Sequence, residues 1–231
     1  MHFSFLKKLR ERQTKFRKLG QPVDTLADIL VEQFSGSQWH QMVRLYGLLS
    51  ASHYKSLDTF RALMKEPRFA SLVTNWDKEP LLARKNVREC LLLVAQRIMK
   101  YPLLLEPLIK TGISDQEKEQ VAKALKAAKE LNNRVNERVA ERQELLQICQ
   151  KIDPKSYVTI GQKRRGRDDL VSVPSRRLLF QGQAIVTCNR IGIGSLSNVS
   201  CTVLILTDCL VFTQQFGDRL QFVCPVCLLT T

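Results

Sequence analysis

Apolar residues recur at intervals of three and four through the first three quarters of the chain, which is the spacing of amphipathic helices. Gly36 and Pro67 interrupt this pattern, and both are expected to end helices. The intervals between such breaks predict helices at residues 25–34, 37–49, 54–64, 86–111 and 114–149, with a short turn at 69–76. We therefore expect most of the chain to form an elongated helical bundle.

The sequence VAQRIMKYPLLLEPLIK at residues 94–110 keeps helical spacing although it contains Pro102 and Pro107. A proline inside a helix costs about 3 kcal/mol, because it lacks an N–H and its ring crowds the carbonyl four residues earlier. The apolar positions nevertheless stay in phase on both sides of Pro102: Leu91, Val94, Ile98, Tyr101, Leu105 and Leu108. This continuity predicts a helix that bends at Pro102 without ending there. The pattern gives no reason for Pro107.

The next predicted helix is the longest of the chain. Ser114 is followed three residues later by Glu117, which is the spacing of a capping box at a helix start. At about 1.5 Å per residue, a helix over 114–149 spans roughly 50 Å. Its expected buried stripe is Val121, Leu125, Ala128, Val135 and Val139.

The pattern changes after Pro154. Residues 161–167 are rich in Gly, Lys and Arg, which favours a flexible basic connector. Short segments rich in β-branched and aromatic residues follow, separated by turn signals, and predict antiparallel strands at 184–187, 202–206, 210–213 and 220–223. The expected fold class is a mostly α, elongated helical bundle followed by a partial antiparallel β domain.

The formal charge of +14 is concentrated in two short segments. Residues 1–20 contain seven Lys or Arg against one Glu, and residues 163–177 contain six against two Asp. Basic segments suit nucleic acid, anionic lipid or acidic proteins, but little aromatic interleaving argues against nucleic acid. We therefore expect no nucleic-acid partner, and keep an anionic membrane surface as a candidate.

Catalytic motifs are absent from the sequence. The three histidines His2, His40 and His53 fall in no nucleophile or metal motif, and no Gly-rich phosphate loop is present. Seven cysteines form no disulfide framework, and the pair Cys224 and Cys227 has no partners for a zinc site. We expect no cofactor, no metal and no enzymatic bond-making chemistry.

Two helix faces depart from the pattern of their helices. The first combines leucines with polar residues, off the buried stripe of the 86–111 helix: Glu89, Leu93, Gln96, Lys100, Leu103 and Pro107. Such a surface suits a protein partner, although other helices of the bundle could equally cover Leu93 and Leu103. The second face carries three asparagines, which are poor helix formers. It comprises Lys129, Asn132, Asn133, Asn136, Ala140 and Gln143, and is either a solvated face or a set of hydrogen-bonding groups for a partner.

The motif QRIMKYPLLL at 96–105, preceded by RECLLLVA at 88–95, resembles the third conserved region of the Dbl-homology domain. That domain is the catalytic module of guanine-nucleotide exchange factors for Rho-family GTPases. FSFLKKLRER at 3–12, ILVEQFSG at 29–36, LYGLLSASHYKSL at 45–57 and EPRFASLV at 66–73 are similar to its Lbc-like, RhoA-directed subfamily. RRLLFQG at 176–182 and LILTDCLVF at 204–212 resemble the start of the pleckstrin-homology domain that follows in these proteins.

This resemblance implies a GTPase-binding site. Lys100 matches the Lys of the family's KYP motif and Asn136 the Asn of its VN motif, and both are expected to contact the switch regions of a RhoA-like GTPase. The other expected contacts are Gln96, Arg97, Asn133 and Leu103. The implied mechanism is release of GDP by stabilising the nucleotide-free GTPase, in the cytoplasm or peripherally at a membrane or the cytoskeleton.

The resemblance also implies domain boundaries. We expect a Dbl-homology domain at 1–153, a basic linker at 154–177 and an incomplete pleckstrin-homology domain at 178–231. In the family, a helix before residue 1 carries the first conserved region, so the sequence resembles a fragment truncated at both ends, and the resemblance leaves open whether this fragment is active alone. One alternative is a membrane-associated scaffold without exchange activity, using Phe3, Phe5, Leu6 and Leu9. Another takes residues 1–20 as a mitochondrial presequence.

Overall fold

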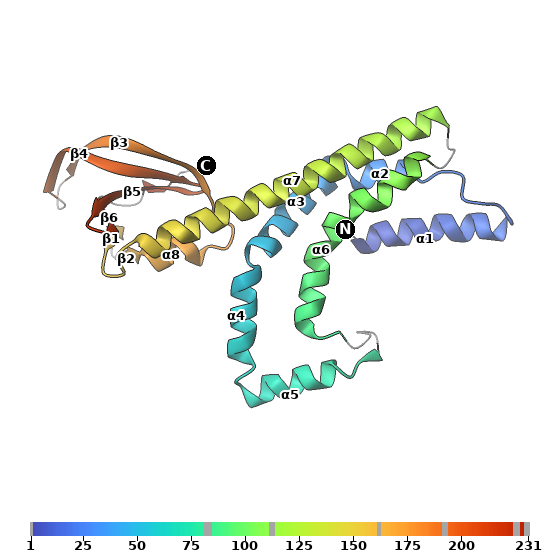
Figure 1. Ribbon diagram of the computed structural model, residues 1–231, viewed down its shortest axis with the longest axis horizontal. Helices are drawn as coiled ribbons and strands as arrows, with labels where there is room; N and C mark the ends of the chain where they lie inside the picture. Colours follow the sequence, from blue (N-terminus) through green and yellow to red (C-terminus); the bar gives the residue numbers. More distant parts are fainter. Residues whose placement is uncertain are drawn as a thin grey trace. The chain divides into compact units, whose positions relative to one another are not determined.

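The computed structural model describes residues 2–80, 85–110, 114–160, 163–190, 194–223 and 227–228 (Figure 1). The chain forms two compact units, Met1–Glu137 and Arg138–Thr231. The first is helical and the second contains a small antiparallel sheet, so the predicted fold class is confirmed.

Seven α-helices and one 3₁₀ helix are described before residue 152. They are α1 (His2–Lys18), α2 (Ala27–Gln33), α3 (Gly36–Ala51), α4 (His53–Leu63), α5 (Pro67–Trp76), α6 (Val87–Leu105), η2 (Glu106–Lys110) and α7 (Asp115–Lys151). The apolar spacing did not predict α1, and it predicted α5 only as a short turn. Pro67 opens α5 in its first turn, where the missing N–H has no helical partner to lose.

Glycine ends α1. Gly20 has φ +63°, its N–H donates to the carbonyl of Arg17, and the N–H of Gln21 donates to the carbonyl of Phe16. This pair of bonds is a Schellman motif, which satisfies the last carbonyls of the helix and requires the left-handed backbone that glycine adopts readily.

The core of the first unit is built from the predicted stripes. Its buried members on α6 and α7 are Ile98, Tyr101, Leu105, Val121, Ala124, Leu125, Ala128, Leu131 and Val135. Val139 is only half-buried, and Val94, at the start of the α6 stripe, is 50% exposed. The core therefore covers the second half of α6 but leaves its first two turns largely uncovered.

The two prolines of the 94–110 stretch have different effects. As predicted, α6 continues through Pro102, and the N–H of Glu106 still donates to the carbonyl of Pro102. The helix predicted over 86–111 does not stay α-helical to its end, because the chain changes to the 3₁₀ helix η2 at Glu106. Pro107 accounts for this change, since it cannot donate to the carbonyl of Leu103 and its ring would crowd it.

The second unit begins within α7 and continues through the segment predicted to be a linker. This segment contains β1 (Tyr157–Ile160) paired antiparallel with β2 (Lys163–Gly166), followed by α8 (Arg167–Ser172). The side chain of Leu170 on α8 is buried, which anchors part of this segment to the unit's core. Residues 161–162 of the predicted connector and Cys224 of the cysteine pair lie outside the described residues.

The main sheet is an antiparallel meander in the order β3–β4–β5–β6, with β7 also paired to β5. Its strands are β3 (Leu178–Arg190), β4 (Gly194–Leu206), β5 (Cys209–Phe216), β6 (Arg219–Phe222) and β7 (Cys227–Leu228). Each contains or overlaps a predicted strand except β7. Alternate residues of β5 are buried against the core, namely Cys209, Val211 and Thr213, as expected for a sheet with one covered face.

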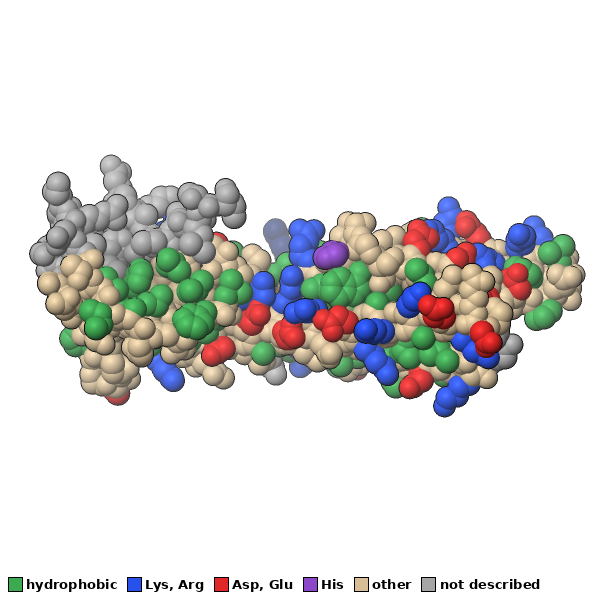
Figure 2. All heavy atoms as spheres, turned by 90° about the horizontal axis from the view of Figure 1, so that it is seen from above, with side chains coloured by type: hydrophobic (Ala, Val, Ile, Leu, Met, Phe, Trp, Pro, Cys, Tyr) green, Lys and Arg blue, Asp and Glu red, His purple; other side chains and the backbone are tan. Residues whose placement is uncertain are grey.

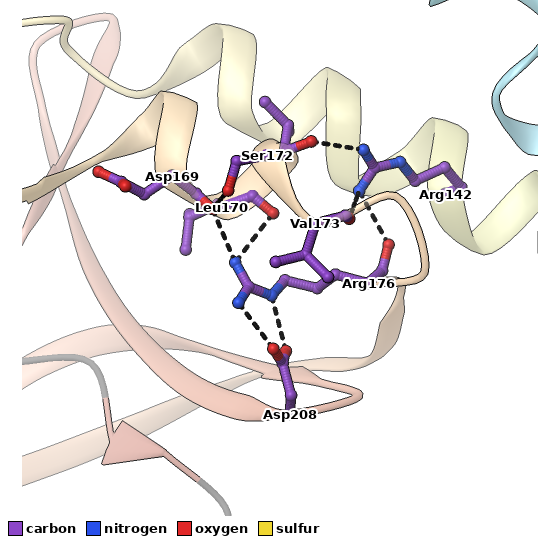
Figure 3. Close-up of polar contacts among 8 residues, drawn as sticks. Arg142, Asp169, Leu170, Ser172, Val173, Arg176 and Asp208 are labelled. Carbon is purple, nitrogen blue, oxygen red and sulfur yellow. Dashed lines mark hydrogen bonds and ion pairs between the residues drawn. The ribbon is translucent and has the colours of Figure 1, made fainter.

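Arg142 of α7 binds three backbone carbonyls, one in the last turn of α8 and two in the loop that follows it. Its guanidinium donates to the carbonyl oxygens of Val171 at 2.7 Å, Arg176 at 2.9 Å and Val173 at 3.2 Å (Figure 3). Arg142 is 5% exposed, so these bonds satisfy a guanidinium that has little access to water. They fix the loop between α8 and β3 against α7.

Arg176 completes this network from the loop itself (Figure 3). Its Nε and Nη2 donate to the two carboxylate oxygens of Asp208 at 2.6 and 2.7 Å, and its Nη1 donates to the carbonyls of Asp169 and Leu170. Asp208 lies in the turn between β4 and β5. The hydrogen bonds from Arg176 lower the pKa of Asp208 below its ordinary value. One buried side chain thus ties α8 to the sheet.

The described surface carries basic, acidic and apolar side chains. On the face shown in Figure 2, basic and acidic side chains lie beside one another over the helices, with apolar side chains between them. Among the described residues, no helix is both long and apolar enough to span a bilayer.

We predict that Arg176→Ala lowers the free energy of unfolding by about 3 kcal/mol, because it leaves a partly buried carboxylate and two carbonyls without their donor. Urea denaturation followed by circular dichroism measures this change. The matched control is Arg134→Ala, which removes only exposed ion pairs with Glu130 and Glu137 and should change stability little. Equal effects of the two substitutions would contradict this role for Arg176.

Candidate functional site

Tyr101 anchors α6 in an aromatic cluster with residues of α1 and of the C-terminal end of α2. Its ring centroid lies 5.1 Å from that of Phe34, the C-cap of α2, and 6.2 Å and 5.9 Å from those of Phe5 and His2 on α1. The Phe34 and Phe5 rings meet Tyr101 edge to face, and the His2 ring stacks on it. Since Tyr101 is 3% exposed, this cluster fixes which side of α6 faces the core.

His2 joins the cluster by two hydrogen bonds. Its Nδ1 lies 2.7 Å from the hydroxyl of Tyr101, and its Nε2 lies 2.6 Å from the hydroxyl of Tyr46 on α3. Burial lowers the pKa of His2, and the positive charge of Arg97 lowers it further. Burial also raises the pKa of Tyr46 to about 12. A neutral imidazole therefore bridges the hydroxyls of Tyr46 and Tyr101 and connects α1, α3 and α6.

Gln96, Lys100 and Leu103 point away from this core. At 100° per residue, they lie on the side of α6 opposite Ile98 and Leu105. Leu103 is 69% exposed and Leu93 40%, so the other described helices do not cover them. The exposed apolar surface on this side extends over Leu92, Met99 and Leu104. In the described structure, neither Gln96 nor Lys100 has a side-chain hydrogen bond or ion pair.

Three other predicted residues of this region take part in local structure. The Arg97 guanidinium lies 5.6 Å from the ring centre of Tyr101, a cation–π geometry that holds it beside the site. Glu89 forms a capping box with Asn86 at the start of α6, which sequence reasoning did not assign to it. Pro107 lies in η2. Thus Leu93, Gln96, Lys100 and Leu103 are the members of the first predicted face that are exposed and have no internal role among the described residues.

The asparagines of α7 do not share one environment. Asn133 and Asn136 are exposed, and their side chains make no hydrogen bond within the described structure. Asn132 is half-buried, with its Oδ1 enclosed and unpaired among the described protein groups. Helices α6 and α7 contribute to the same core, but no hydrogen bond between described residues joins Lys100 to Asn136. The structure therefore leaves Asn133 and Asn136 available to a partner.

The described residues offer little for bond-making chemistry. They contain no group of three or more His, Cys, Asp or Glu that could hold a metal ion. Cys149 is buried, which raises the pKa of its thiol to about 11 and keeps it protonated at neutral pH. The ring of His40 contacts the carbonyl of Gly36 in its own helix. What this arrangement offers is a binding surface.

The sequence profile of the RhoGEF domain matches residues 1–136. The chain is 31% identical to mouse "Rho guanine nucleotide exchange factor 2" over 232 residues, which covers 96% of the chain and 23% of that protein. It is 29% identical to mouse "Rho guanine nucleotide exchange factor 18", covering 96% of the chain and 16% of that protein. The chain thus spans a quarter or less of the length of these curated relatives.

Solved structures share the fold. The linker and DH/PH domains of p115-RhoGEF align with a TM-score of 0.58 at 21% identity, covering 98% of this chain and 66% of that one. The DH/PH fragment of PDZRHOGEF in its complex with human RhoA aligns with a TM-score of 0.57 at 21% identity, covering 98% and 64%. At this identity the likeness concerns the fold alone.

We predict that stability falls as the pH drops below about 6.5, because unfolding releases His2 from burial and lets it bind a proton that the folded chain disfavours. His2→Gln keeps hydrogen-bonding capacity but cannot titrate, so its stability should fall less over the same range. Thermal denaturation of both proteins at pH 7.5 and pH 5.5 measures the difference. Equal losses in the two proteins would exclude His2 as the group responsible.

Proposed function

The chain belongs to the RhoGEF domain family, and we propose that it is a guanine-nucleotide exchange factor for a Rho-family GTPase. The observation that supports this most directly is the solvent-facing side of α6, where the exposed Lys100 has no ion pair among the described residues and Leu103 is 69% exposed. A free cation beside exposed leucines can contact an acidic or polar partner surface and bury apolar area together. RhoA, named as the partner of the PDZRHOGEF fragment, is the GTPase to test first.

The proposed mechanism is differential binding. A protein shifts the state of its partner only as far as it binds one state more tightly than the other. Lys100 on α6 and Asn136 on α7 would hold the switch regions of the GTPase in a conformation that no longer shelters nucleotide and magnesium. Gln96, Arg97, Asn133 and Leu103 would complete the contact. GDP then dissociates and GTP replaces it, without any covalent bond being made or broken by this chain.

We predict that the chain binds nucleotide-free RhoA more tightly than RhoA with GDP and magnesium, and that Lys100→Ala weakens the tighter complex about tenfold. Loss of a charge-assisted hydrogen bond costs this much. Asn136→Ala should weaken it about fivefold, as expected for a neutral hydrogen bond. Biolayer interferometry with the two forms of RhoA measures the affinities, and release of a fluorescent GDP analogue measures exchange.

Lys126→Ala is the matched control, because Lys126 is an exposed lysine of α7 without an ion pair in the described structure. Binding and exchange are measured separately, so that a variant that binds but does not release nucleotide is recognised. Circular dichroism checks that each variant is folded. Equal affinity for both nucleotide states, or an unchanged affinity in Lys100→Ala, would refute the proposed mechanism.

A further inference from the structure

The seven cations of α1 differ in their partners. Lys8 forms an ion pair with Glu32, and Arg12 binds Asp28 at 2.6 Å and the carbonyl of Thr25 at 2.8 Å. These two cations hold α1 against α2. Lys7 forms a longer, exposed pair with the only acidic residue of the helix, at position 11. The other four are exposed and have no ion pair in the described structure: Arg10, Lys15, Arg17 and Lys18.

Apolar side chains of α1 are divided in the same way. Phe5 is buried and Leu9 is half-buried in the core, so neither can reach an external surface. Phe3, by contrast, is 82% exposed, and Leu6 and Leu19, the residue that follows α1, are also exposed. A surface hollow of about 650 Å³ along α1 is lined by both kinds of free residue, including Phe3, Leu6, Arg10, Lys15, Lys18 and Leu19.

We propose that this outward side of α1 binds anionic lipid surfaces. The unpaired cations match the negative charge of such a surface, and exposed apolar side chains on the same helix can enter the boundary between headgroups and acyl chains. A nucleic-acid backbone would use the cations but would leave the apolar side chains, above all Phe3, in water. With Phe5 and Leu9 fixed in the core, α1 would lie along the lipid surface, and its 17 residues offer about 25 Å of contact.

This surface differs from the one that the sequence indicated. The sequence assigned Phe3, Phe5, Leu6 and Leu9 to a lipid contact, whereas the structure retains Phe3 and Leu6 and adds Leu19. Each cation near an anionic surface strengthens binding about fivefold, so the four free cations together account for several hundredfold. The inference does not rest on the proposed exchange function, because it involves no residue of the α6 face.

The test is co-sedimentation of the chain with phosphatidylcholine vesicles that either contain or lack phosphatidylserine. We expect binding only to the anionic vesicles, weakening as salt is raised. Changing all four free cations to Gln should reduce the partition coefficient at least a hundredfold. The matched control changes four exposed cations elsewhere that have no ion pair in the described structure, namely Lys55, Lys65, Arg68 and Lys126, and should reduce it by less than about fivefold.

Phe3→Ser tests the apolar part of the contact. It should reduce binding severalfold and leave the salt dependence unchanged, whereas Phe216→Ser, at an exposed aromatic residue of β5, should have no effect. Equal binding to both vesicle types, or equal loss in the two quadruple variants, would overturn the proposal. If instead the chain binds an RNA duplex through the same four cations, and Phe3→Ser does not change its binding to vesicles, then the partner of this surface is nucleic acid and not lipid.

Discussion

The aromatic cluster around Tyr101 is the constraint on which the candidate site depends. Tyr101 and Lys100 are neighbours in sequence, so successive steps of 100° send one into the core and the other to the far side of α6. The contacts of Tyr101 with Phe5, Phe34 and His2 fix the rotation of the helix about its axis. Any change that turned α6 would bury Lys100 or expose Tyr101. The exposed face is therefore a consequence of how firmly the opposite face is packed.

The two prolines are compatible with this constraint because the core, and not local propensity, decides the path of α6. Burying Leu105 beyond Pro102 stabilises the continuing turn by about 1.5–3 kcal/mol, which offsets much of the proline's cost. At Pro107 the neighbouring Leu108 and Ile109 are only half-buried, and the chain relaxes into a 3₁₀ helix. The two prolines thus carry a similar local cost, but the α-helix continues only after Pro102, where more apolar surface is buried by the residues that follow.

The sequence predicted features that follow from regular spacing and missed those that depend on distant contacts. The stripes of α6 and α7 and the turns beside β5 follow from spacing and turn residues alone. The apolar pattern did not predict helix α1, because few of its residues are apolar and face the core, whereas many are cations. The exposure of Leu103 could not be read from its spacing, since that depends on which helices cover it. The bond of Arg176 to Asp208 joins positions 32 residues apart, which no local pattern reveals.

Contacts between distant residues also decide which charges of the chain are accessible to a partner. A value of +14 counts Arg142 and Arg176, which are buried donors to carbonyls and to Asp208, equally with cations exposed to solvent. It also counts Arg12, whose role is to hold α2. What a partner encounters is the remainder, distributed along particular helix faces and mixed with acidic groups elsewhere (Figure 2). Because screening confines exposed charges to a range of about 8 Å at physiological salt, a local set of unpaired cations determines attraction more than the net charge does.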